Sequence, residues 1–288
     1  MSAFTLPSAT LLAQSVLSGV FVGALYGLLG LGLGLSWGLL RQINLAHFAF
    51  AFLAAYLCYQ LATMGMDPLA TLLVIVPAFF ALGAALHALL ARFKITPFNS
   101  LLVTFGLTGI IEALIQSIWT ADFRKLESSY ADQKFKVGGL FVPVPELITL
   151  VLAVGISLAV WAVLRHTDLG KAMRAAAEDA PIASAFGVNQ KRNALLLAGT
   201  CAALASIAGV CLALSFTLAP SQIYAWISVV FAAVMLGGLG RALGPLIAGT
   251  VIGVSEAITM AVTAPSWAPI VSFTLLIVIL VLRPGRAA

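Results

Sequence analysis

The stretch HTDLGKAMRAAAEDAPIASAFGVNQKRN, from His166 to Asn193, is the longest polar interruption between segments that are otherwise almost continuously apolar. With Arg165 at its edge, it contains five of the fifteen lysines and arginines and three of the ten acids. In a chain that is 62% hydrophobic and only 9% charged, such a stretch belongs in water. Its positive excess is typical of cytoplasmic loops, so we expect it on the cytoplasmic side of a membrane.

The local pattern of this stretch indicates two short helices. Asp168 is expected to cap a helix from about Leu169 to Glu178. Pro181 suits the first turn of a second helix, and Gly187 can end that helix in the left-handed conformation. Two interpretations remain open. The stretch is either a solvated loop that only connects two spans, or a docking element that passes force from a soluble partner into the membrane domain.

The composition of the whole chain indicates an all-α fold, a polytopic transmembrane helical bundle. Mean hydropathy is +1.10, and the apolar runs are long enough to cross a bilayer. These runs are apolar at odd and even positions alike, which excludes the alternation expected of a transmembrane β-barrel. We expect residues 1–288 to form a single transmembrane domain, which the resemblance described below makes a permease domain.

The apolar runs and the basic residues together predict a topology. Nine runs are expected to span, at about 10–40, 45–61, 70–91, 101–120, 146–164, 194–214, 225–236, 243–262 and 269–282. Residues 121–145 are polar and of mixed charge, as in an external loop. Eleven of the fifteen basic residues fall on the other side, which places the N-terminus outside and the C-terminus in the cytoplasm. Eight spans are the alternative, if 225–236 does not cross fully or the first run is re-entrant.

Small residues recur at steps of four in two of these runs. The stripes comprise Gly19, Gly23 and Gly27, then Gly30, Gly34 and Gly38, and, near the C-terminus, Gly249, Gly253 and Ala257. This spacing allows neighbouring helices to touch backbone to backbone, and we assign these glycines to helix packing, together with the adjacent buried acid Glu256. The first run exceeds a perpendicular span, so its helix should be tilted, extended beyond the bilayer or broken near the glycines.

Polar residues inside the predicted spans are the candidate transport site. The fourth span carries a drifting polar stripe with a step of four, comprising Thr104, Thr108, Glu112 and Gln116. An intramembrane carboxyl group must face protein or water, so this stripe should face a pathway or form a hydrogen-bond network between helices. Asn44 and His47 begin the second span, and a lone histidine near a helix end is often a structural residue.

The sequence contains no motif of an enzyme. It has no GxxxxGK[ST] phosphate-binding loop, no Ser–His–Asp grouping with supporting context and no His-rich metal cluster. We therefore expect this chain to bind no metal or cofactor and not to hydrolyse ATP itself. A glycine-rich bundle with buried acids and one docking-like segment favours a transporter subunit that is driven from outside.

Four stretches, in order over most of the chain, resemble the LivH-type permeases of bacterial ATP-binding cassette (ABC) importers, the high-affinity branched-chain amino acid transporter family. They are GALYGLLGLGLGLSWGLLRQINLAHFAFAFLAAY (23–56), TFGLTGIIEALIQ (104–116), LGKAMRAAAEDAPIASAFGVNQKRN (169–193) and VMLGGLGRALGPLIAGTVIGVSEAI (234–258). The third is the most specific, because it carries the pattern R-A-x-A-E-D-x-x-x-A-x-x-x-G-[VI] from Arg174 to Val188.

The resemblance implies partners and roles. The partners would be a second, related permease, two cytoplasmic ATPases that carry ATP and Mg, and a periplasmic substrate-binding protein, at the bacterial inner membrane. Residues 166–193 would form the ATPase-docking segment, through Lys171, Arg174, Glu178, Asp179 and Gly187. The substrate pathway would include Asn44, His47, Thr108, Glu112 and Gln116.

The substrate is less defined than the family. Phe48 and Ala49 follow His47 where family members commonly have Gly and an acid, and residues 121–145 match nothing in the family. The expected function is import of a small amphipathic solute by alternating access, a branched-chain or related amino acid first, with urea, a short amide or an aromatic acid as alternatives. The rival hypotheses are an ion-gradient-driven transporter or channel that uses Glu112 and Glu256, and a structural scaffold.

Overall fold

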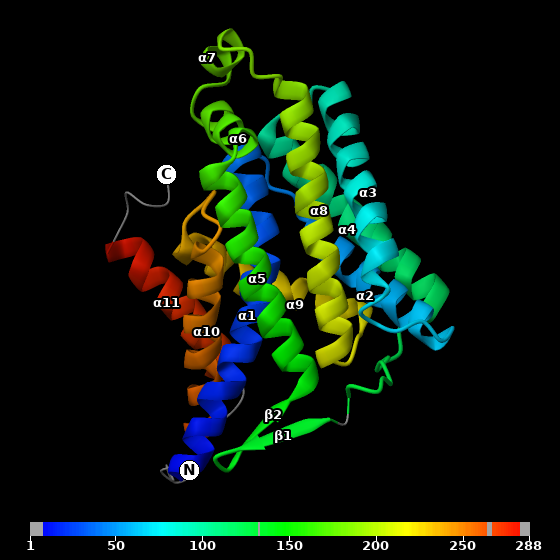
Figure 1. The fold of residues 1–288 in the computed structure, drawn as a ribbon, viewed down its shortest axis with the longest axis vertical. Helices are drawn as coiled ribbons and strands as arrows, with labels where there is room; N and C mark the ends of the chain where they lie inside the picture. The colour runs from blue at the N-terminus through cyan, green and yellow to red at the C-terminus, as the bar shows by residue number, and fades with distance from the viewer. Residues whose placement is uncertain (1–7, 132, 264–266, 283–288) are drawn as a thin grey trace.

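The computed structural model describes residues 8–131, 133–263 and 267–282, and Figure 1 shows long helices with a β-hairpin at one end and two short helices at the other. The long helices are α1 (Ala9–Leu40), α2 (Ala46–Thr63), α3 (Leu72–Arg92), α4 (Pro97–Trp119), α5 (Val144–His166), α8 (Gln190–Ser215), α9 (Ile223–Gly237), α10 (Gly244–Val262) and α11 (Ala268–Leu282). The short elements are α6 (Asp168–Glu178), α7 (Ala180–Ala185), a 3-10 turn (Pro220–Gln222), β1 (Lys134–Val137) and β2 (Leu140–Pro143).

Eight helices in the described part of the chain are long and apolar enough to cross a membrane. They are α1 to α5, α8, α9 together with the turn before it, and α10. This confirms the prediction of a polytopic helical bundle. The ninth predicted span corresponds to α11, whose 15 described residues are fewer than the roughly 20 of a perpendicular span. The segment at 225–236, whose full crossing the sequence left open, is among the eight.

Helix α1 is continuous over 32 residues, so of the three alternatives for the long first run the break near its glycines is wrong. Glycine inside a helix costs about 1 kcal/mol relative to alanine, but here the missing side chains allow close packing. A Cβ atom on Gly23 would lie 2.5 Å from the carbonyl oxygen of Gly249, and one on Gly253 would lie 2.6 Å from the Gly23 nitrogen. The glycine stripes of α1 and α10 therefore face each other, while Gly30 and Gly34 lie against Val234 of α9.

The two ends of the bundle carry different polar segments. At one end the Gln14 side chain pairs with the backbone of Phe141 through two hydrogen bonds of 2.9 Å, and Arg124 pairs with Leu218 through the backbone. We call this the hairpin end. At the other end the Arg41 guanidinium donates to the Ala177 carbonyl at 2.8 Å. We call this the coupling end. Because α1 reaches both ends, its re-entrant alternative is also wrong.

The hairpin of β1 and β2 was not predicted. It lies inside the predicted external loop, and its strands pair antiparallel with Val137 opposite Leu140. Gly138 and Gly139 form the two-residue turn with φ of 58° and 88°, as the favoured turns of hairpins require. The strands have only four residues each, so the short polar and apolar alternation of β1 from Lys134 to Val137 was too brief to predict a strand, and its side chains are all exposed.

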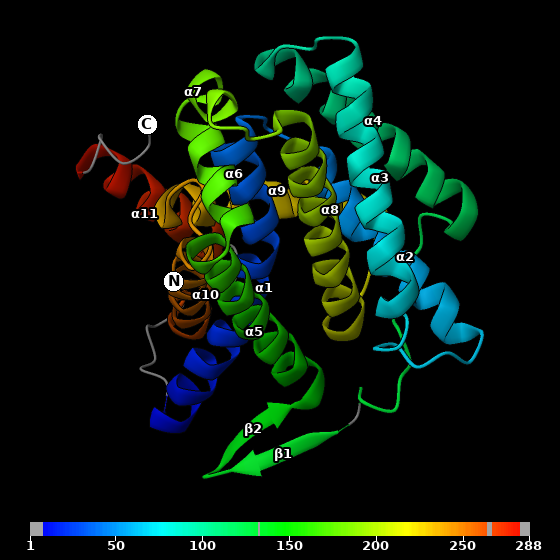
Figure 2. The same ribbon diagram turned by 45° about the horizontal axis from the view of Figure 1, so that its top comes forward.

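The core lies around α2 and α8. Nearly all of α2 from Ala46 to Tyr56 is buried, and Phe48, Phe50 and Phe52 are among the largest fully buried side chains. Figure 2 shows α3 and α4 along one flank and α10 and α11 along the other, with α1, α8 and α9 between them. The outer flanks expose apolar side chains, as expected for surfaces that face lipid or another membrane subunit.

Candidate functional site

Helix α6 is capped by Thr167, not by Asp168 as predicted. The Thr167 hydroxyl accepts a hydrogen bond from the Gly170 N–H at 3.1 Å, and Thr167 has the extended conformation of an N-cap residue. Asp168 is the first helical residue and pairs with Lys171 at 3.0 Å on an exposed surface. An acid in the first turn still favours the helix through its dipole. The prediction placed the helix correctly and its cap one residue too late.

Helix α7 begins and ends as its sequence predicts. Pro181 lies in the first turn, and Gly187 follows the helix with φ of 87°. The cap is Asp179, whose carboxylate accepts from the Ile182 N–H at 2.9 Å. Among the residues assigned to docking, Asp179 and Gly187 therefore shape the segment, whereas Lys171, Arg174 and Glu178 expose their side chains.

Helix α6 is packed onto three membrane helices. Met173 lies in a buried cluster with Leu35 of α1, Leu164 of α5 and Leu197 of α8. Gly170 lies directly on the backbone of α5, where a side chain would meet Leu164. The Arg41 hydrogen bond to α6 adds a polar contact with the end of α1. A displacement of α6 must therefore move the ends of α1, α5 and α8.

Helix α7 presents an apolar surface that the sequence reasoning missed. Ile182 and Phe186 expose 57% and 86% of their surface, although both are large apolar side chains in a polar segment. Their spacing of four places them on one side of the helix, which was a signal available in the sequence. Figure 1 shows α7 projecting beyond the ends of the long helices. Exposed apolar groups in such a position are typical of a protein-binding surface.

The predicted polar stripe of α4 divides into two parts. Thr104 and Thr108 are fully buried and donate to backbone carbonyls of their own helix at 2.8 and 2.9 Å, and Thr104 also accepts from the Leu45 N–H. Glu112 is half-buried and accepts from the exposed Gln116 side chain at 3.2 Å. A step of four residues drifts by about 40° each time, so the stripe turns by about 120° from Thr104 to Gln116.

Glu112 lies beside a surface of α4 that nothing in the described chain covers. A Cβ atom added to Gly106 or Gly109 would meet no atom within 4 Å. The Tyr224 hydroxyl at the start of α9 lies in reach of the Glu112 carboxyl group, and the Tyr224 ring packs 6.2 Å from the Phe105 ring. We call this surface the open face of α4. It combines one acid, two aromatic rings and room for a ligand or a partner.

Asn44 and His47 belong to the interior and not to the open face. The His47 ring lies against Gly32, and its Nε2 atom is 3.0 Å from the Leu29 carbonyl oxygen. The Asn44 Oδ1 atom has no hydrogen-bond partner in the described structure and borders a cavity of about 20 Å³ that Gln42 also lines. A polar cavity of this size has room for one water molecule. The structure thus separates these two residues from Glu112 and Gln116.

Glu256 is held at the junction of α1, α9 and α10. The Tyr26 hydroxyl donates to its carboxylate at 3.0 Å, and the Tyr26 ring contacts Trp226 edge-on at 5.6 Å. The Glu256 side chain is buried, next to the glycine contact between α1 and α10. The geometry fits the packing role assigned from the sequence, because the acid links the helices that these glycines bring together.

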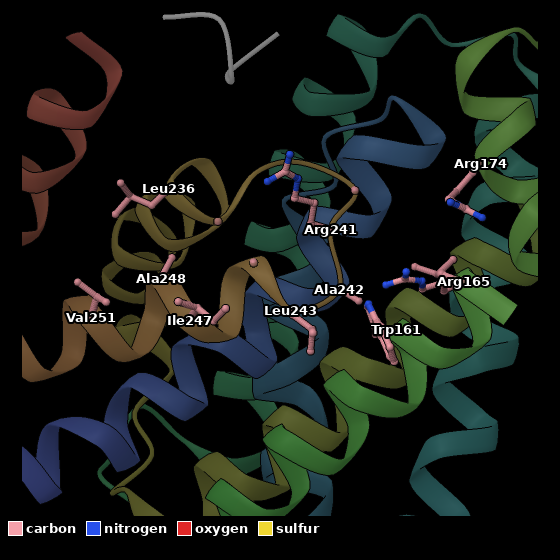
Figure 3. Close-up of a pocket in the computed structure, with 14 residues that line it drawn as sticks. Trp161, Arg165, Arg174, Leu236, Arg241, Ala242, Leu243, Ile247, Ala248 and Val251 are labelled. Carbon is pink, nitrogen blue, oxygen red and sulfur yellow. The ribbon is translucent and has the colours of Figure 1, made fainter. Parts of the chain in front are cut away.

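A large cavity at the coupling end was not anticipated. It has a volume of about 900 Å³ and lies between α5, α6 and the turn that joins α9 to α10. Figure 3 shows Arg165 and Trp161 on one wall and Ile247 and Val251 on the other. Among the described residues that line it are three arginines, Arg165, Arg174 and Arg241, and no acid.

Residues 15–280 match a family described as branched-chain amino acid transport system / permease component. The chain belongs to this family. The permease is accordingly a multi-pass membrane protein and a non-catalytic subunit of a transport system. The resemblance recognised in four stretches of the sequence is thereby confirmed.

Curated relatives of this permease match over nearly their full length. It is 28% identical to the high-affinity branched-chain amino acid transport system permease protein LivH of Salmonella typhimurium, over 94% of this chain and 93% of the relative. LivH of Escherichia coli K12 is 27% identical with the same coverage, and BraD of Pseudomonas aeruginosa is 25% identical over 94% of each chain. No solved structure matches significantly.

Proposed function

We propose that this chain is one of two permeases of a bacterial ABC importer that moves a branched-chain or related amino acid across the inner membrane by alternating access. Family membership supports the permease role, and the names of the relatives motivate the substrate. The identity of 25–28% to these relatives leaves the substrate a proposal. Urea, a short amide or an aromatic acid are the alternatives to be tested.

The proposed partners fit the two ends of the bundle. Two ATPases that bind ATP and Mg would contact α6 and α7 at the coupling end, in the cytoplasm. A periplasmic substrate-binding protein would contact the hairpin end. Basic residues favour this orientation, because the hairpin end has four between Arg124 and Lys136 whereas the others in the described chain lie at the coupling end. The predicted cytoplasmic C-terminus lies outside the described residues.

The observation that carries the proposal is the packing of α6 on the ends of α1, α5 and α8. A docking helix transmits force only if it is fixed to the elements that must move, and α6 is fixed by Met173, Gly170 and Arg41. The exposed Ile182 and Phe186 would enter the ATPase surface, and the exposed Glu178 of α6 would supply a charged contact. A loop that only connects two spans would need neither feature.

The open face of α4 is the proposed wall of the substrate pathway, which the second permease would complete. Glu112 can bind the ammonium group of an amino acid, and Phe105 and Tyr224 can contact its apolar side chain. Asn44, His47 and Thr108, also assigned to the pathway, would support this wall from behind. Gln116 lies on the open face with Glu112.

Co-purification of the ATPases tests the docking assignment. Glu178→Arg should lower the recovery of ATPase with the tagged chain by about tenfold, because it reverses a charge in the contact. Glu127→Arg is the matched control, since it makes the same charge change at an exposed site of the hairpin end. Folded wild-type protein that recovers no ATPase would contradict the proposal.

Uptake into proteoliposomes separates the importer from the ion-gradient alternative and identifies the substrate. The importer should accumulate labelled leucine only with internal ATP, the ATPases and the binding protein present. Unlabelled urea, acetamide and benzoate, each in excess, should not compete. Uptake that follows a proton or sodium gradient without ATPases would favour a secondary transporter based on Glu112 and Glu256.

A further inference from the structure

We propose that the groove between α5 and α10 binds one anionic phospholipid, with its phosphate on Arg165, Arg174 and Arg241 and an acyl chain along the two helices. The site goes beyond the proposed transport function. It requires only that the coupling end lies at a membrane surface. It shares Arg174 with the predicted docking residues, but the purified chain can be tested without ATPases, so the test does not depend on the importer assignment.

The head of this groove is the cavity of Figure 3. Its three arginines come from α5, α6 and the α9–α10 turn, and none of them forms an ion pair within the described structure. The Arg165 guanidinium lies over the Trp161 ring at 5.3 Å, which holds it at the wall. Three uncompensated arginines on three elements suit a phosphate, because guanidinium groups bind phosphate oxygens in pairs.

The tail of the groove is a second hollow, of about 520 Å³, which adjoins the first. It is lined by apolar residues of α5 and α10, and both hollows share Ile247 and Val251. The hydroxyls of Thr250 and Ser255 also border it, but each donates to a backbone carbonyl of α10, at 2.8 and 2.7 Å. The groove therefore presents an apolar surface throughout this part.

Along α5 and α10 these features run in order from charged to apolar. Arg165 lies next to the last residue of α5, and Arg241 lies in the turn just before α10. Ile247 and Val251 follow in the first two turns of α10. Charge at the helix ends and apolar surface one and two turns deeper match an amphiphile with its headgroup at the water boundary. Basic pockets between membrane helices commonly bind anionic headgroups.

Charge complementarity favours a lipid over a protein partner. A protein that filled the cavity would have to place acids against three arginines and, at the same time, apolar groups in the hollow below. A single anionic phospholipid meets both demands, and it is present in every bacterial inner membrane. Because α5 and α10 each pack on α1, the floor of the groove is closed while its outer side is open, so a lipid would enter from that side.

Lipid binding by the purified full-length chain tests the site. Delipidated protein in neutral detergent would be titrated with dioleoyl phosphatidylglycerol and followed by native mass spectrometry. Dioleoyl phosphatidylcholine, which has the same acyl chains and no net charge, should bind far more weakly. Arg165→Gln with Arg241→Gln should weaken phosphatidylglycerol binding about twenty-five-fold, since each basic residue near a membrane surface contributes about a fivefold effect.

Two further variants complete the design. Lys191→Gln with Arg192→Gln is the matched control, because it removes the same charge at the same end but outside the cavity. Its phosphatidylglycerol binding should stay near that of the wild type. Ile247→Trp fills the groove without a change in charge, and its exposed position tolerates the larger ring. It should weaken binding of the long-chain lipid.

Four results would overturn the proposal. Equal binding of the two lipids, or an equal loss in the control variant, would show no specific headgroup site. Displacement of phosphatidylglycerol by millimolar inorganic phosphate, together with unchanged binding by Ile247→Trp, would show a free phosphate site. Loss of the lipid when the second permease is co-purified would show that a protein covers the groove. Each variant must first match the wild type in helicity and in size-exclusion profile.

Discussion

Single glycines determine how closely the helices approach. Gly23 of α1 and Gly249 of α10 lie within van der Waals reach of each other's backbone, whereas Gly106 of α4 faces open space. The sequence separates the two kinds only in part, because Gly23 and Gly249 recur at steps of four and Gly106 does not, but this spacing does not say which helix lies opposite. The difference depends on the neighbouring helix, which only the three-dimensional structure reveals.

Substitution of these glycines should have opposite effects. Gly23→Val should lower the stability of the purified chain by about 1–3 kcal/mol, because the branched side chain overpacks a backbone contact. Gly106→Ala, at a glycine in open space, should be neutral or stabilising by up to about 1 kcal/mol, because alanine favours a helix and nothing lies within 4 Å. Unfolding in detergent, followed by circular dichroism, measures both. A similar loss in both variants would contradict the packing argument.

The hydrogen bond from Tyr130 to Asp67 predicts a pH effect at the hairpin end. This hydrogen bond is the main cause of a lowered pKa of the Asp67 carboxyl group, aided by the backbone N–H groups of Leu69 and Ala70. A carboxyl group whose pKa is lower in the folded state than in the unfolded state stabilises the fold at pH values above its unfolded-state pKa. This stabilisation is lost as the pH falls through its folded-state pKa. The contact should therefore be unaffected between neutral pH and about pH 5.

Tyr130→Phe should raise the pKa of Asp67 toward its ordinary value, because it removes the strongest contact with the carboxylate. Carboxyl chemical shifts in an NMR titration of selectively labelled protein measure this change. Glu127→Gln, on the same loop, should leave the Asp67 titration as it is. An unchanged Asp67 pKa in the Tyr130 variant would show that the backbone N–H groups suffice.

At the scale of the elements, the coupling of α6 can be separated from the docking of α7. Arg41→Gln removes the hydrogen bond to α6 but leaves the exposed surface of α7 intact. In the proposed importer it should reduce uptake while ATPase recovery stays normal. Phe186→Asp changes only an exposed side chain and should abolish ATPase recovery. Parallel uptake and co-purification assays distinguish the two, and equal losses of ATPase in both variants would contradict the separation.

Helices were predictable from the sequence to within about four residues, because the apolar runs mark the spans. Pro181 and Gly187 bound α7 as expected, whereas α4 begins at Pro97, four residues before the predicted start. The partners of each helix were not predictable. The stripe from Thr104 to Gln116 looked like one surface, yet its slow drift around α4 separates a buried half from an open half.

At the scale of the whole molecule, the open face of α4 should be the meeting surface of two permeases. Gly109→Trp places a large ring where the chain itself offers no contact, so the isolated chain should fold normally. In the proposed importer it should block uptake or prevent association with the second permease. Glu112→Gln should reduce uptake and leave assembly intact, since it removes charge without changing size. Loss of assembly in Glu112→Gln would favour a structural network instead.

The length of α1 has a mechanical consequence. It is one uninterrupted helix of 32 residues, or about 48 Å, with Arg41 bound to α6 at one end and Gln14 bound to the hairpin at the other. Such a helix acts as a lever arm. A tilt of about 5° at the coupling end would displace the opposite end by about 4 Å, more than the length of a hydrogen bond. A movement of α6 on one side of the membrane would then break or shift the hydrogen bonds between Gln14 and Phe141 on the other side.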